Sequence, residues 1–409
     1  MSATKTSRRE SVLRNRTVAG IGLASFFSDA GHEMATAALP AFLTSLGAPA
    51  AALGAIEGVA DAALSTSKLA GGVVADRRGT DRRRVAAAGY LVTGLGYGSF
   101  AFAGSWPAVA LGRAVAWAAR GLRTPAREAL LAEAVPPEYL GRAFGIERAG
   151  DSLGAIAGPL VAAALLSTIG YRHLFWISFF PALAAALSVR FLAREVPRAR
   201  DVAHHVGMSI RELATAPGLF RSLLAGVGLY GLGNFSATLL ILRATQILSF
   251  EGRSAASAAA TAVLLYTAHN AANAFAAYPA GALADRIGRR VVLVMGVALF
   301  ALACVAFAFS PSSLPILAAL FVAIGASTAL VETAEGSHAA EVLPIALRGR
   351  GYGVVGLVDG VGDLVSSLVV GVLWTVASPA WGFAYAALLS MLGALVLIPG
   401  CLTARRPSA

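Results

Sequence analysis

Charged residues are scarce in this chain. Of its 409 residues, only 13% are Asp, Glu, Lys or Arg, whereas 57% are hydrophobic. A soluble globular protein carries roughly 25% charged residues and 45–50% apolar ones. The shortage of charge therefore argues against a water-soluble enzyme of two or three ordinary domains, and it favours a polytopic membrane protein.

Cysteine is scarcer still, and catalytic motifs are missing. Cys304 and Cys401 both lie in apolar stretches, which argues against a disulfide framework and against a thiolate metal cluster. The sequence contains no His-Glu-x-x-His and no phosphate-binding loop, patterns that would indicate common enzyme classes. We therefore expect a protein that is not an enzyme and that needs no cofactor.

Positive charge exceeds negative charge, and it is unevenly distributed. The formal net charge of +11 would suggest nucleic acid as the partner of a soluble protein. In a membrane protein it has another cause, because Lys and Arg collect in cytoplasmic loops. Basic loops here alternate with loops that are nearly without positive charge. This pattern predicts an even number of spans with both termini in the cytoplasm, and no nucleic-acid partner.

Long hydrophobic runs are abundant. Apolar runs of about 18 or more residues predict transmembrane helices, because a helix satisfies its backbone polar groups within the lipid. If each span and its connection takes about 30–35 residues, the chain holds about twelve helices. The predicted spans are 17–46, 50–75, 84–104, 107–132, 141–168, 172–193, 218–249, 255–282, 290–310, 313–340, 350–377 and 380–402.

The one long polar connection lies near the midpoint of the chain. It divides the predicted spans into two bundles of six helices, over 17–193 and 218–402, joined by a cytoplasmic loop over 194–217. A cytoplasmic segment over 1–16 precedes them, and a cytoplasmic tail over 403–409 follows them. The predicted fold class is an all-α membrane protein with twelve transmembrane helices in two pseudo-symmetric bundles.

An internal repeat supports two equivalent halves. The segment around Asp76 matches the segment around Asp285, and a second match aligns Asp151 with Asp359 at nearly the same offset. Two separate matches at nearly one offset indicate a duplicated six-helix unit.

The first repeated segment resembles the loop motif of the major facilitator superfamily. Its pattern, Gly-x-x-x-Asp-Arg-x-Gly, is formed by Gly72, Asp76, Arg77 and Gly79 and again by Gly281, Asp285, Arg286 and Gly288. The resemblance covers essentially the whole chain. It implies two six-helix bundles around a central cavity, and alternating access by rocking of the halves. It also implies that the motif is a conformational latch, the alternative being that its arginines only set the topology.

Two further resemblances concern direction and substrate. Gly154-x-x-x-Gly158-Pro159 resembles a motif associated with antiporters of this superfamily, although it also fits an ordinary small-residue helix contact. Segments around Asp29, Arg120 and Glu147 are similar to a bacterial branch that includes nickel-resistance exporters. That branch often has His in place of Glu147, and this chain has no histidine-rich tail.

Ionisable residues within the predicted spans are the candidate functional residues, because each costs roughly 2.5–3.5 kcal/mol to insert. Asp29 and Glu33 share a helix face, with His32 beside them. Two adjacent carboxylates disfavour double ionisation, so one of them can take up a proton. Alternatively, the three side chains hold a divalent cation, or they pair with an arginine. Arg113 and Arg120 are the candidate partners, and the resemblance implicates Arg113 in proton coupling.

Several other ionisable groups remain candidates for proton coupling or substrate contact, or for polar contacts between helices. Glu57 and Asp61 share a face with Lys68, so these three can neutralise one another. Arg120, Arg123 and Arg127 can instead pair with Glu128 or Glu133 near the membrane edge. The further candidates are Glu147 and Asp151 in the first half and His269, Asn270, Glu332 and Glu335 in the second.

These features together predict a secondary active transporter. The favoured function is a proton-coupled exporter (antiporter) of a small organic molecule or drug, with the proton gradient as its energy source. A divalent metal exporter and a proton symporter that imports a small metabolite remain alternatives. We expect a monomeric, multi-pass protein of the cytoplasmic (inner) membrane, whose partners are its substrate and the lipid bilayer.

Overall fold

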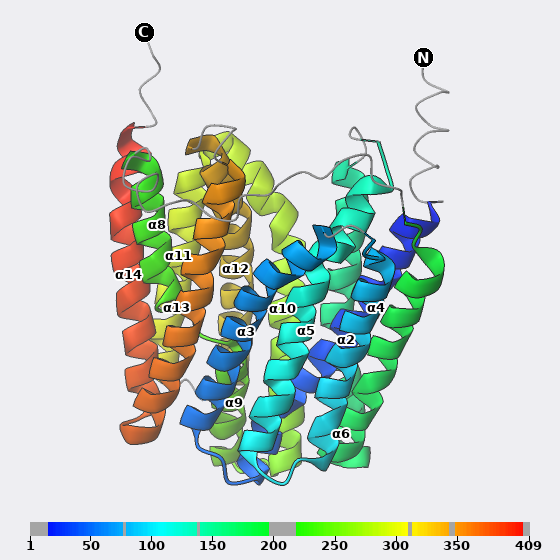
Figure 1. The fold of residues 1–409 in the computed structure, drawn as a ribbon. Coiled ribbons are helices and arrows are strands. Elements are labelled where there is room, and N and C mark those ends of the chain that lie inside the picture. Colours follow the sequence, from blue (N-terminus) through cyan, green and yellow to red (C-terminus); the bar gives the residue numbers. More distant parts are fainter. Residues whose placement is uncertain are drawn as a thin grey trace. The chain divides into compact units, whose positions relative to one another are not determined.

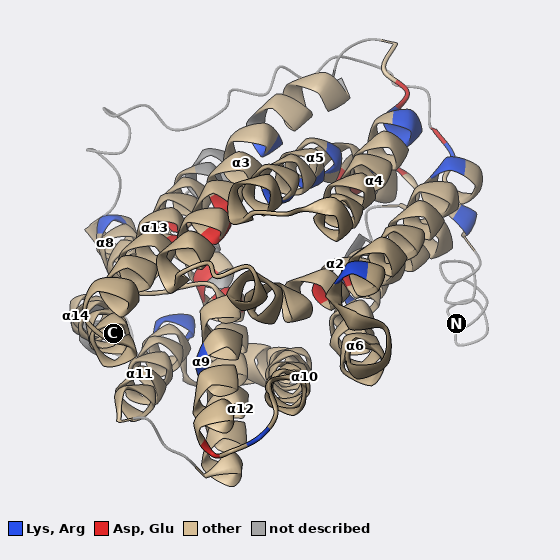
Figure 2. Ribbon diagram, turned by 90° about the horizontal axis from the view of Figure 1, so that it is seen from below, with Lys and Arg blue, Asp and Glu red and all other residues tan. Residues whose placement is uncertain are grey.

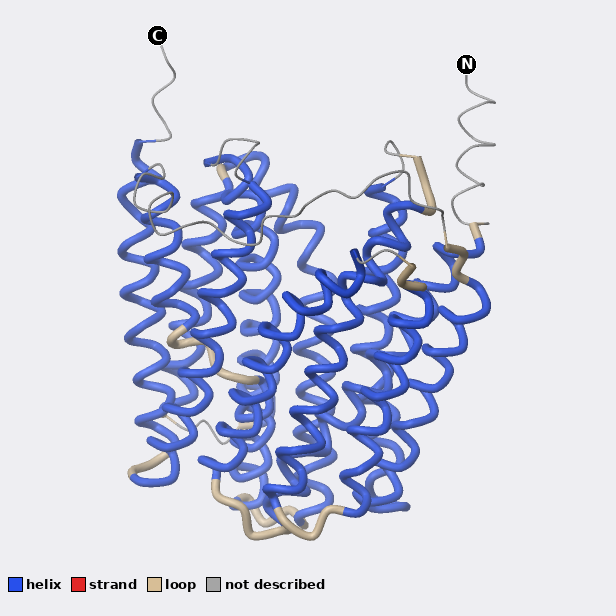
Figure 3. The backbone as a smooth tube through the Cα atoms, viewed as in Figure 1, coloured by secondary structure: helices blue, strands red, loops and turns tan. Residues whose placement is uncertain are grey.

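The fold is known from a computed structural model, drawn in Figure 1. It describes residues 15–76, 79–136, 140–195, 218–309, 313–342 and 348–403. The described residues form helices joined by loops, and no strand occurs among them (Figure 3). The predicted all-α class is therefore confirmed. Most of the predicted central loop, together with positions 1–14 and 404–409, lies outside the described residues.

The chain is divided into two compact units. Unit 1 comprises Met1–Leu46 and Ala62–Ala203, and unit 2 comprises Gly47–Asp61 and His204–Ala409. Helix α3 (Ala50–Asp76) contributes to both, because its residues up to Asp61 cluster with unit 2 and the later ones with unit 1.

Unit 1 contains, besides its part of α3, the helices α2 (Arg16–Ser45), α4 (Arg82–Gly98), α5 (Trp106–Glu133) and α6 (Leu140–Leu192). A short 3-10 helix, η1 (Ser99–Phe102), follows α4. Helix α6 covers both spans that were predicted over 141–168 and 172–193. Gly170 turns the chain inside it with φ 72° and ψ 173°, a conformation that glycine adopts at little cost because it has no Cβ.

Unit 2 holds the helices of the second half of the chain. They are α8 (Gly218–Gly231), α9 (Ala237–Phe250), α10 (Ala255–Ile287), α11 (Arg289–Ala308), α12 (Leu314–Val342), α13 (Arg348–Val376) and α14 (Pro379–Thr403).

The structure differs from the prediction of one continuous helix over 218–249. The helical segment is interrupted between Gly231 and Ala237. Gly233 and Asn234 are weak helix formers, and Ser236 accepts a hydrogen bond from the backbone of Thr238 as the N-cap of α9. The apolar run predicted one helix because hydrophobicity alone does not register such a local interruption.

Six helical segments of the described chain are long and apolar enough to cross a membrane. They are Arg82–Phe102, Ala143–Leu192, Arg289–Ala308, Leu314–Gly336, Val354–Val376 and Pro379–Pro399. Helices α8 and α9 are too short to do so singly, and ionisable residues lower the hydropathy of α2 and α5. The number of twelve spans therefore stays a prediction.

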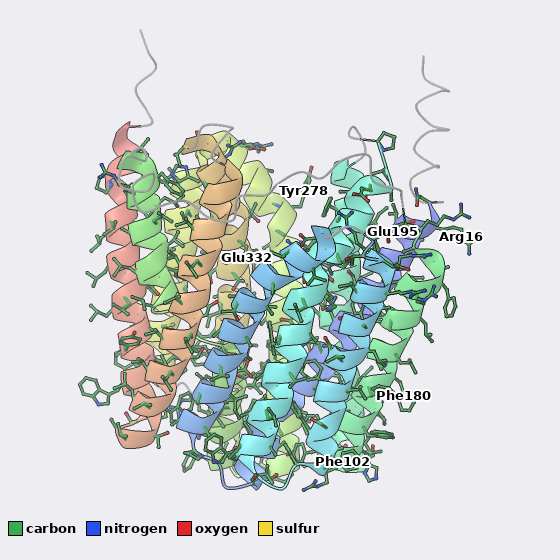
Figure 4. All side chains as sticks on the ribbon, viewed as in Figure 1. Arg16, Phe102, Phe180, Glu195, Tyr278 and Glu332 are labelled. Atoms are coloured by element: carbon green, nitrogen blue, oxygen red, sulfur yellow. The ribbon has the colours of Figure 1, made fainter. Side chains whose placement is uncertain are left out.

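Large apolar side chains project from the surface of the helices. Phe102, Phe180 and Tyr278 are 77%, 52% and 87% exposed (Figure 4). A soluble protein rarely exposes so much apolar surface, whereas hydrocarbon chains of a lipid bilayer can cover it. The surface thus agrees with a membrane-embedded protein.

Glycines bring α2 and α6 into backbone contact within unit 1. A Cβ added at Gly154 would collide with the carbonyl oxygen of Phe26, and one added at Gly158 with that of Ala30. Small residues at such spacing let two helices approach closely. This contact between the two backbones therefore fixes the position of the α2 side chains along α6.

We predict that Gly158→Leu destabilises the protein. The larger side chain must separate α2 from α6, and overpacking of this kind costs about 1–3 kcal/mol. Thermal unfolding in detergent measures the effect. Gly145→Leu on the same helix is the matched control, because a Cβ at Gly145 has no neighbour within 4 Å. Equal melting temperatures for the two variants would contradict the close contact.

Candidate functional site

A column of arginines runs along α5 in unit 1 (Figure 2). Arg113, Arg120 and Arg127 recur every seven residues and therefore share one helix face, with Arg123 one turn from Arg120. Arg113 and Arg123 are each only 1% exposed. A buried guanidinium is costly unless acceptors or negative charges surround it, so the neighbours of this column decide its role.

The carboxylate of Asp29 is one of these neighbours. Its Oδ1 lies 3.2 Å from Nη2 of Arg120, and the residue is buried on α2. Of the two partners that the sequence offered for Asp29, this ion pair selects Arg120. The carboxylate and the guanidinium neutralise each other in a low-dielectric surrounding, where an isolated charge would be strongly destabilising.

His32 and Arg113 share two hydroxyl groups. Nδ1 of His32 lies 2.7 Å from the hydroxyl of Tyr97 and 3.3 Å from that of Thr36. Arg113 donates to the same hydroxyls, at 3.0 Å for Thr36 and 3.4 Å for Tyr97. Tyr97 thus accepts from Arg113 and can donate to Nδ1, which leaves the proton of the neutral ring on Nε2. Nε2 lies 3.5 Å from Oε1 of Glu33.

Trp117 packs in the middle of this network. Its ring lies under the guanidinium groups of Arg113 and Arg120, at 5.1 and 5.3 Å, and meets the ring of His32 edge-on at 5.3 Å. Cation–π contacts of this kind stabilise a partly desolvated guanidinium. Trp117 therefore supports the arginines, rather than packing only against apolar neighbours as is usual for aromatic residues of transmembrane helices.

The three candidate metal ligands of α2 do not converge on one point. Asp29 is directed to Arg120, and His32 is directed to Tyr97 and Glu33. Among the described residues, no group of three or more His, Cys, Asp or Glu side chains is arranged to hold a metal ion. Two nearby guanidinium groups would also repel a divalent cation.

A second ion pair lies farther along α5. Nη2 of Arg127 is 2.7 Å from Oε1 of Glu147 on α6, and Ser25 contacts both side chains. The Glu147 carboxyl also forms a side-chain hydrogen bond with Asp151. Arg127 therefore lies beside two carboxyl groups that are in contact with each other.

Arg123 contacts neither Glu128 nor Glu133 in the described structure. It donates to the hydroxyl of Ser28 at 2.9 Å and lies 3.7 Å above the ring of Tyr90. Glu133 instead pairs with Arg82. Arg123 thus has a hydroxyl and an aromatic ring as its contacts, whereas Arg127 has Glu128 among its electrostatic neighbours.

The ionisable residues of α3 separate between the two units. Asp61 acts electrostatically on Asp363 of unit 2, whereas Lys68 has Glu128 of unit 1 as its negative neighbour. Glu57 is 2% exposed and clusters with unit 2. Residues on one face of α3 thus have electrostatic neighbours on different helices, because different helices pack along its length.

A group of carboxyl side chains occurs in unit 2. Glu335 of α12 forms a side-chain hydrogen bond with Asp359 of α13, and Glu332 and Asp363 are its next charged neighbours. Oδ1 of Asp363 accepts a hydrogen bond of 3.2 Å from Asn234. The sequence proposed Glu332 and Glu335 only as weak candidates, and their grouping with Asp359 depends on the packing of α12 against α13.

His269 and Asn270 lie elsewhere in unit 2. His269 of α10 stacks on Tyr266 at 5.7 Å, and its backbone packs against Gly325 of α12. Asn270 is half-buried beside it. The structure places these two residues in helix packing, apart from the carboxyl hydrogen bond of Glu335.

The repeated loop motif requires its glycines. Gly79 and Gly288 occupy equivalent positions of the repeat and adopt φ values of 78° and 100°, which favour glycine. Asp285 lies 4.0 Å from Arg289 and its side chain is 76% exposed, so this pair contributes only about 0–1 kcal/mol. Arg286 is exposed, and Gly72 has open space around it. The Asp76 side chain and Arg77 lie outside the described residues.

Asp81 follows the first copy of this motif and caps α4. Its carboxylate accepts hydrogen bonds from the backbones of Arg83 and Arg84 at 3.0 and 3.2 Å. Burial alone would raise the pKa of Asp81, but these hydrogen bonds and the Arg83 side chain outweigh it and hold the pKa below its ordinary value. The cap is therefore present at neutral pH and is weakened as the pH falls through that pKa.

The pair formed by Arg82 and Glu133 was not foreseen from the sequence. Arg82 also donates to the carbonyl oxygen of Ala75 at 3.0 Å. It thereby connects α3, α4 and α5 at one end of unit 1. Arg290, near the start of α11 in the second half, donates to the carbonyl oxygen of Leu397 at 2.6 Å.

Comparison with known proteins decides the family. A sequence profile of the Major Facilitator Superfamily matches residues 21–264 and 248–409. The chain belongs to this superfamily. An MFS-type transporter of Methanocaldococcus jannaschii is 27% identical over 389 residues, covering 92% of this chain and 93% of that protein. A protein of Mycobacterium tuberculosis is 29% identical over 369 residues, covering 88% of this chain and 87% of the other.

Solved transporter structures share the superfamily fold. A bacterial homologue of the lysosomal transporter Spinster, in an inward-facing and unoccupied conformation, has a TM-score of 0.73 at 16% identity and covers 96% of this chain and 98% of its own. The nucleoside transporter NupG has a TM-score of 0.77 at 14% identity, covering 94% and 99%. The chain is accordingly a multi-pass membrane protein of a transporter family, and the predicted resemblance is confirmed.

We predict that Asp29 and Arg120 are energetically coupled in this superfamily member. Asp29→Asn or Arg120→Gln alone removes one partner of a buried pair, which costs about 3–5 kcal/mol. The double variant leaves neither charge uncompensated. Its free energy of unfolding should therefore fall by less than the sum of the losses in the two single variants. Chemical unfolding of the four proteins in detergent gives the coupling free energy. Strictly additive losses would show that the two charges do not interact.

Proposed function

We propose that this superfamily member is a proton-coupled exporter that moves a small organic molecule by alternating access. The observation that carries the proposal is the pairing of two buried carboxylates with arginines of α5. Asp29 pairs with Arg120, and Glu147 pairs with Arg127. Each pair joins a group that can bind a proton to a cation that cannot release one at working pH.

Protonation changes the strength of these contacts. When a proton neutralises the carboxylate, the buried arginine loses its counter-charge and the ion pair no longer holds its two helices together. Loss of the proton restores the attraction. Occupancy by a proton can therefore bias the protein between two conformations, which is what coupling to a gradient requires.

The carboxylates are also mechanically linked to the contact between α2 and α6. A Cβ at Gly154 would lie 3.1 Å from Cβ of Asp29, and one at Gly158 would lie 3.0 Å from Cβ of Glu33. A change in the α2–α6 contact therefore moves both carboxylates. This linkage, next to Pro159, supports the export direction that the motif suggests.

An organic substrate is favoured over a divalent metal. Asp29 pairs with Arg120, whereas His32 contacts Tyr97 and Glu33, and two guanidinium groups lie nearby. Import by symport would use the same carboxylates. A D-xylose-proton symporter shares the fold, with a TM-score of 0.68 at 16% identity and coverage of 95% of this chain and 97% of its own.

The cellular setting of the proposal follows from charge and hydrophobicity. The basic loops support a location in the cytoplasmic membrane with both termini in the cytoplasm. The transporter would act as a monomer, with the proton gradient as its energy source and no cofactor.

We predict that substitution of the unit 1 carboxylates abolishes gradient-driven transport but leaves substrate exchange intact. In proteoliposomes with an imposed proton gradient, Asp29→Asn, Glu33→Gln or Glu147→Gln should abolish gradient-driven substrate movement. Substrate exchange without a gradient should survive, because it needs the conformational change but no net proton transfer. A pH-sensitive dye trapped inside the vesicles reports the accompanying proton flux.

The control for this experiment is Glu251→Gln, since Glu251 is an exposed residue at the end of α9. It should transport like the parent protein. Parent protein that exchanges substrate but does not respond to the proton gradient would refute proton coupling. If all three unit 1 variants respond fully to the gradient, these carboxylates do not couple transport to protons.

We predict that Asp76→Asn biases the transporter towards its inward-facing state and slows turnover. The loop motif is proposed to latch the outward-facing state through Asp76 and nearby arginines, and the amide removes the negative charge. Labelling of single cysteines on the two faces measures the bias. Asp285→Asn should shift it in the same direction. Unchanged labelling and unchanged turnover in Asp76→Asn would show that the motif is no latch.

A further inference from the structure

The carboxyl group cluster of unit 2 is not used by the proposed proton network. Its members are Asp61, Glu332, Glu335, Asp359 and Asp363, which come from α3, α12 and α13. They act on one another electrostatically, through Asp363 with Asp61 and Asp359, and through Glu335 with Glu332 and Asp359. Negative charge is therefore concentrated in one part of unit 2.

These carboxyl groups are within reach of a ligand. Glu332 is exposed on α12, where Figure 4 labels it. Glu335, Asp359 and Asp363 are half-buried. They are thus neither fully enclosed by protein nor fully hydrated. In such partly buried surroundings, a cation can reach a carboxylate and is attracted to it more strongly than in bulk water.

The two units compensate their carboxylates differently. In unit 1, Asp29 and Glu147 each contact an arginine. In unit 2, the strongest charged neighbours of Glu335 are other carboxyl groups. Two buried basic side chains of unit 2 contact other groups, since Arg290 donates to a backbone carbonyl and His338 meets Glu341. Added positive charge would be favourable beside Glu335.

The helix interruption between α8 and α9 borders this cluster. Asn234, within the interruption, donates to Asp363 of α13 at 3.2 Å, and the backbone N–H of Ser236 donates to Ser367 at 3.1 Å. Tyr230, near the end of α8, has Asp363 among its electrostatic neighbours. The C-terminal end of a helix carries partial negative charge, so the end of α8 also favours a cation.

Two fully buried hydroxyl groups at the interruption have no hydrogen-bond partner among the described residues. They belong to Ser366 and Ser390, both 0% exposed. The Ser390 hydroxyl lies 2.9 Å from the Cβ position of Gly233. Ser366 is one turn beyond Gly362, whose Cα lies 3.5 Å from the Cβ position of Gly231 at the end of α8. An unsatisfied buried hydroxyl is costly, so a polar ligand near it is favoured.

We propose that this cluster and the adjoining interruption of α8–α9 bind a protonated primary or secondary amine, so that the exported molecule is an organic cation. This inference rests on the proposed function as an exporter and specifies its substrate class. The ammonium N–H groups would donate to Glu335, Asp359 and Asp363, with the hydroxyl of Ser366 as a further acceptor. A quaternary ammonium lacks such donors and would bind less well.

Amine binding should displace a proton from the cluster. A hydrogen bond between two carboxyl groups needs a proton on one of them, so the proposal includes a proton between Glu335 and Asp359 that leaves before both carboxylates face the ammonium group. Among the described residues, the ionisable groups that share electrostatic interactions within this cluster are Asp61 of α3, Tyr230 of α8, Glu332 of α12 and Asp363 of α13. These four groups are acidic. Amine affinity should therefore rise with pH while the amine itself stays protonated.

The test begins with a thermal-shift screen of the purified full-length protein. The probes are matched sets of amines, alcohols and carboxylates that share a carbon skeleton, such as 2-phenylethylamine, 2-phenylethanol and 3-phenylpropanoate. Stabilisation by amines beyond their matched alcohols and carboxylates is expected. Titration calorimetry of the strongest amine at pH 6 and pH 8, in two buffers of different ionisation enthalpy, then measures affinity and proton release on the unmodified protein.

Variants locate the site. Glu335→Gln and Asp363→Asn should each weaken amine binding about tenfold or more, whereas Glu251→Gln should not change it. Stabilisation by carboxylates or alcohols in place of amines would overturn the inference. So would amine binding without proton release in the parent protein, a measurement that does not depend on whether the variants fold.

The outcome is separable from that of the proposed function. If a proton gradient drives export of an anionic or neutral substrate, the proposed function stands and the inference of an organic cation as substrate is wrong. Amine binding that depends on Glu335 and Asp363, but no response of amine transport to the gradient, would retain the amine site and refute proton coupling.

Discussion

A charge inside a membrane protein must meet an opposite charge, a hydrogen-bond partner or a proton, because the surrounding lipid offers none of them. The arrangement of this transporter depends on that constraint. The four arginines of α5 would be strongly destabilising singly, and each is placed against a carboxylate, a hydroxyl or an aromatic ring. The same contacts join α5 to α2 and α6.

The duplicated halves of the chain solve this problem in different ways. Asp151 and Asp359 occupy equivalent positions of the repeat, and each is hydrogen-bonded to another carboxyl group. In unit 1, Arg127 stands beside the carboxyl pair. In unit 2, the pair has further carboxyl groups as its nearest charged neighbours. The two halves of the repeat have thus kept a carboxyl position while the charged groups around it differ.

Glycine and helix interruptions determine where these polar groups lie. Gly154 and Gly158 let α2 approach α6 closely, directly beside Asp29 and Glu33. The interruption after Gly231 brings the side chain of Asn234 to Asp363. In both places the absence of a bulky side chain, or of helical hydrogen bonding, gives a polar residue its partner.

The all-helical class, the internal repeat, the superfamily and the candidate residues could be predicted from the sequence, because hydrophobic runs, repeated motifs and isolated charges are properties of the chain itself. Only the tertiary structure decided the partners. Asp29 meets Arg120 although 91 positions separate their numbers, and Lys68 and Asp61 diverge although they share one helix face. Spacing along one helix shows which side chains share a face, whereas the packing of other helices against that face determines which charges meet. The sequence therefore determined which charged residues lie within the helices, and the packing of the helices determined which of them neutralise one another.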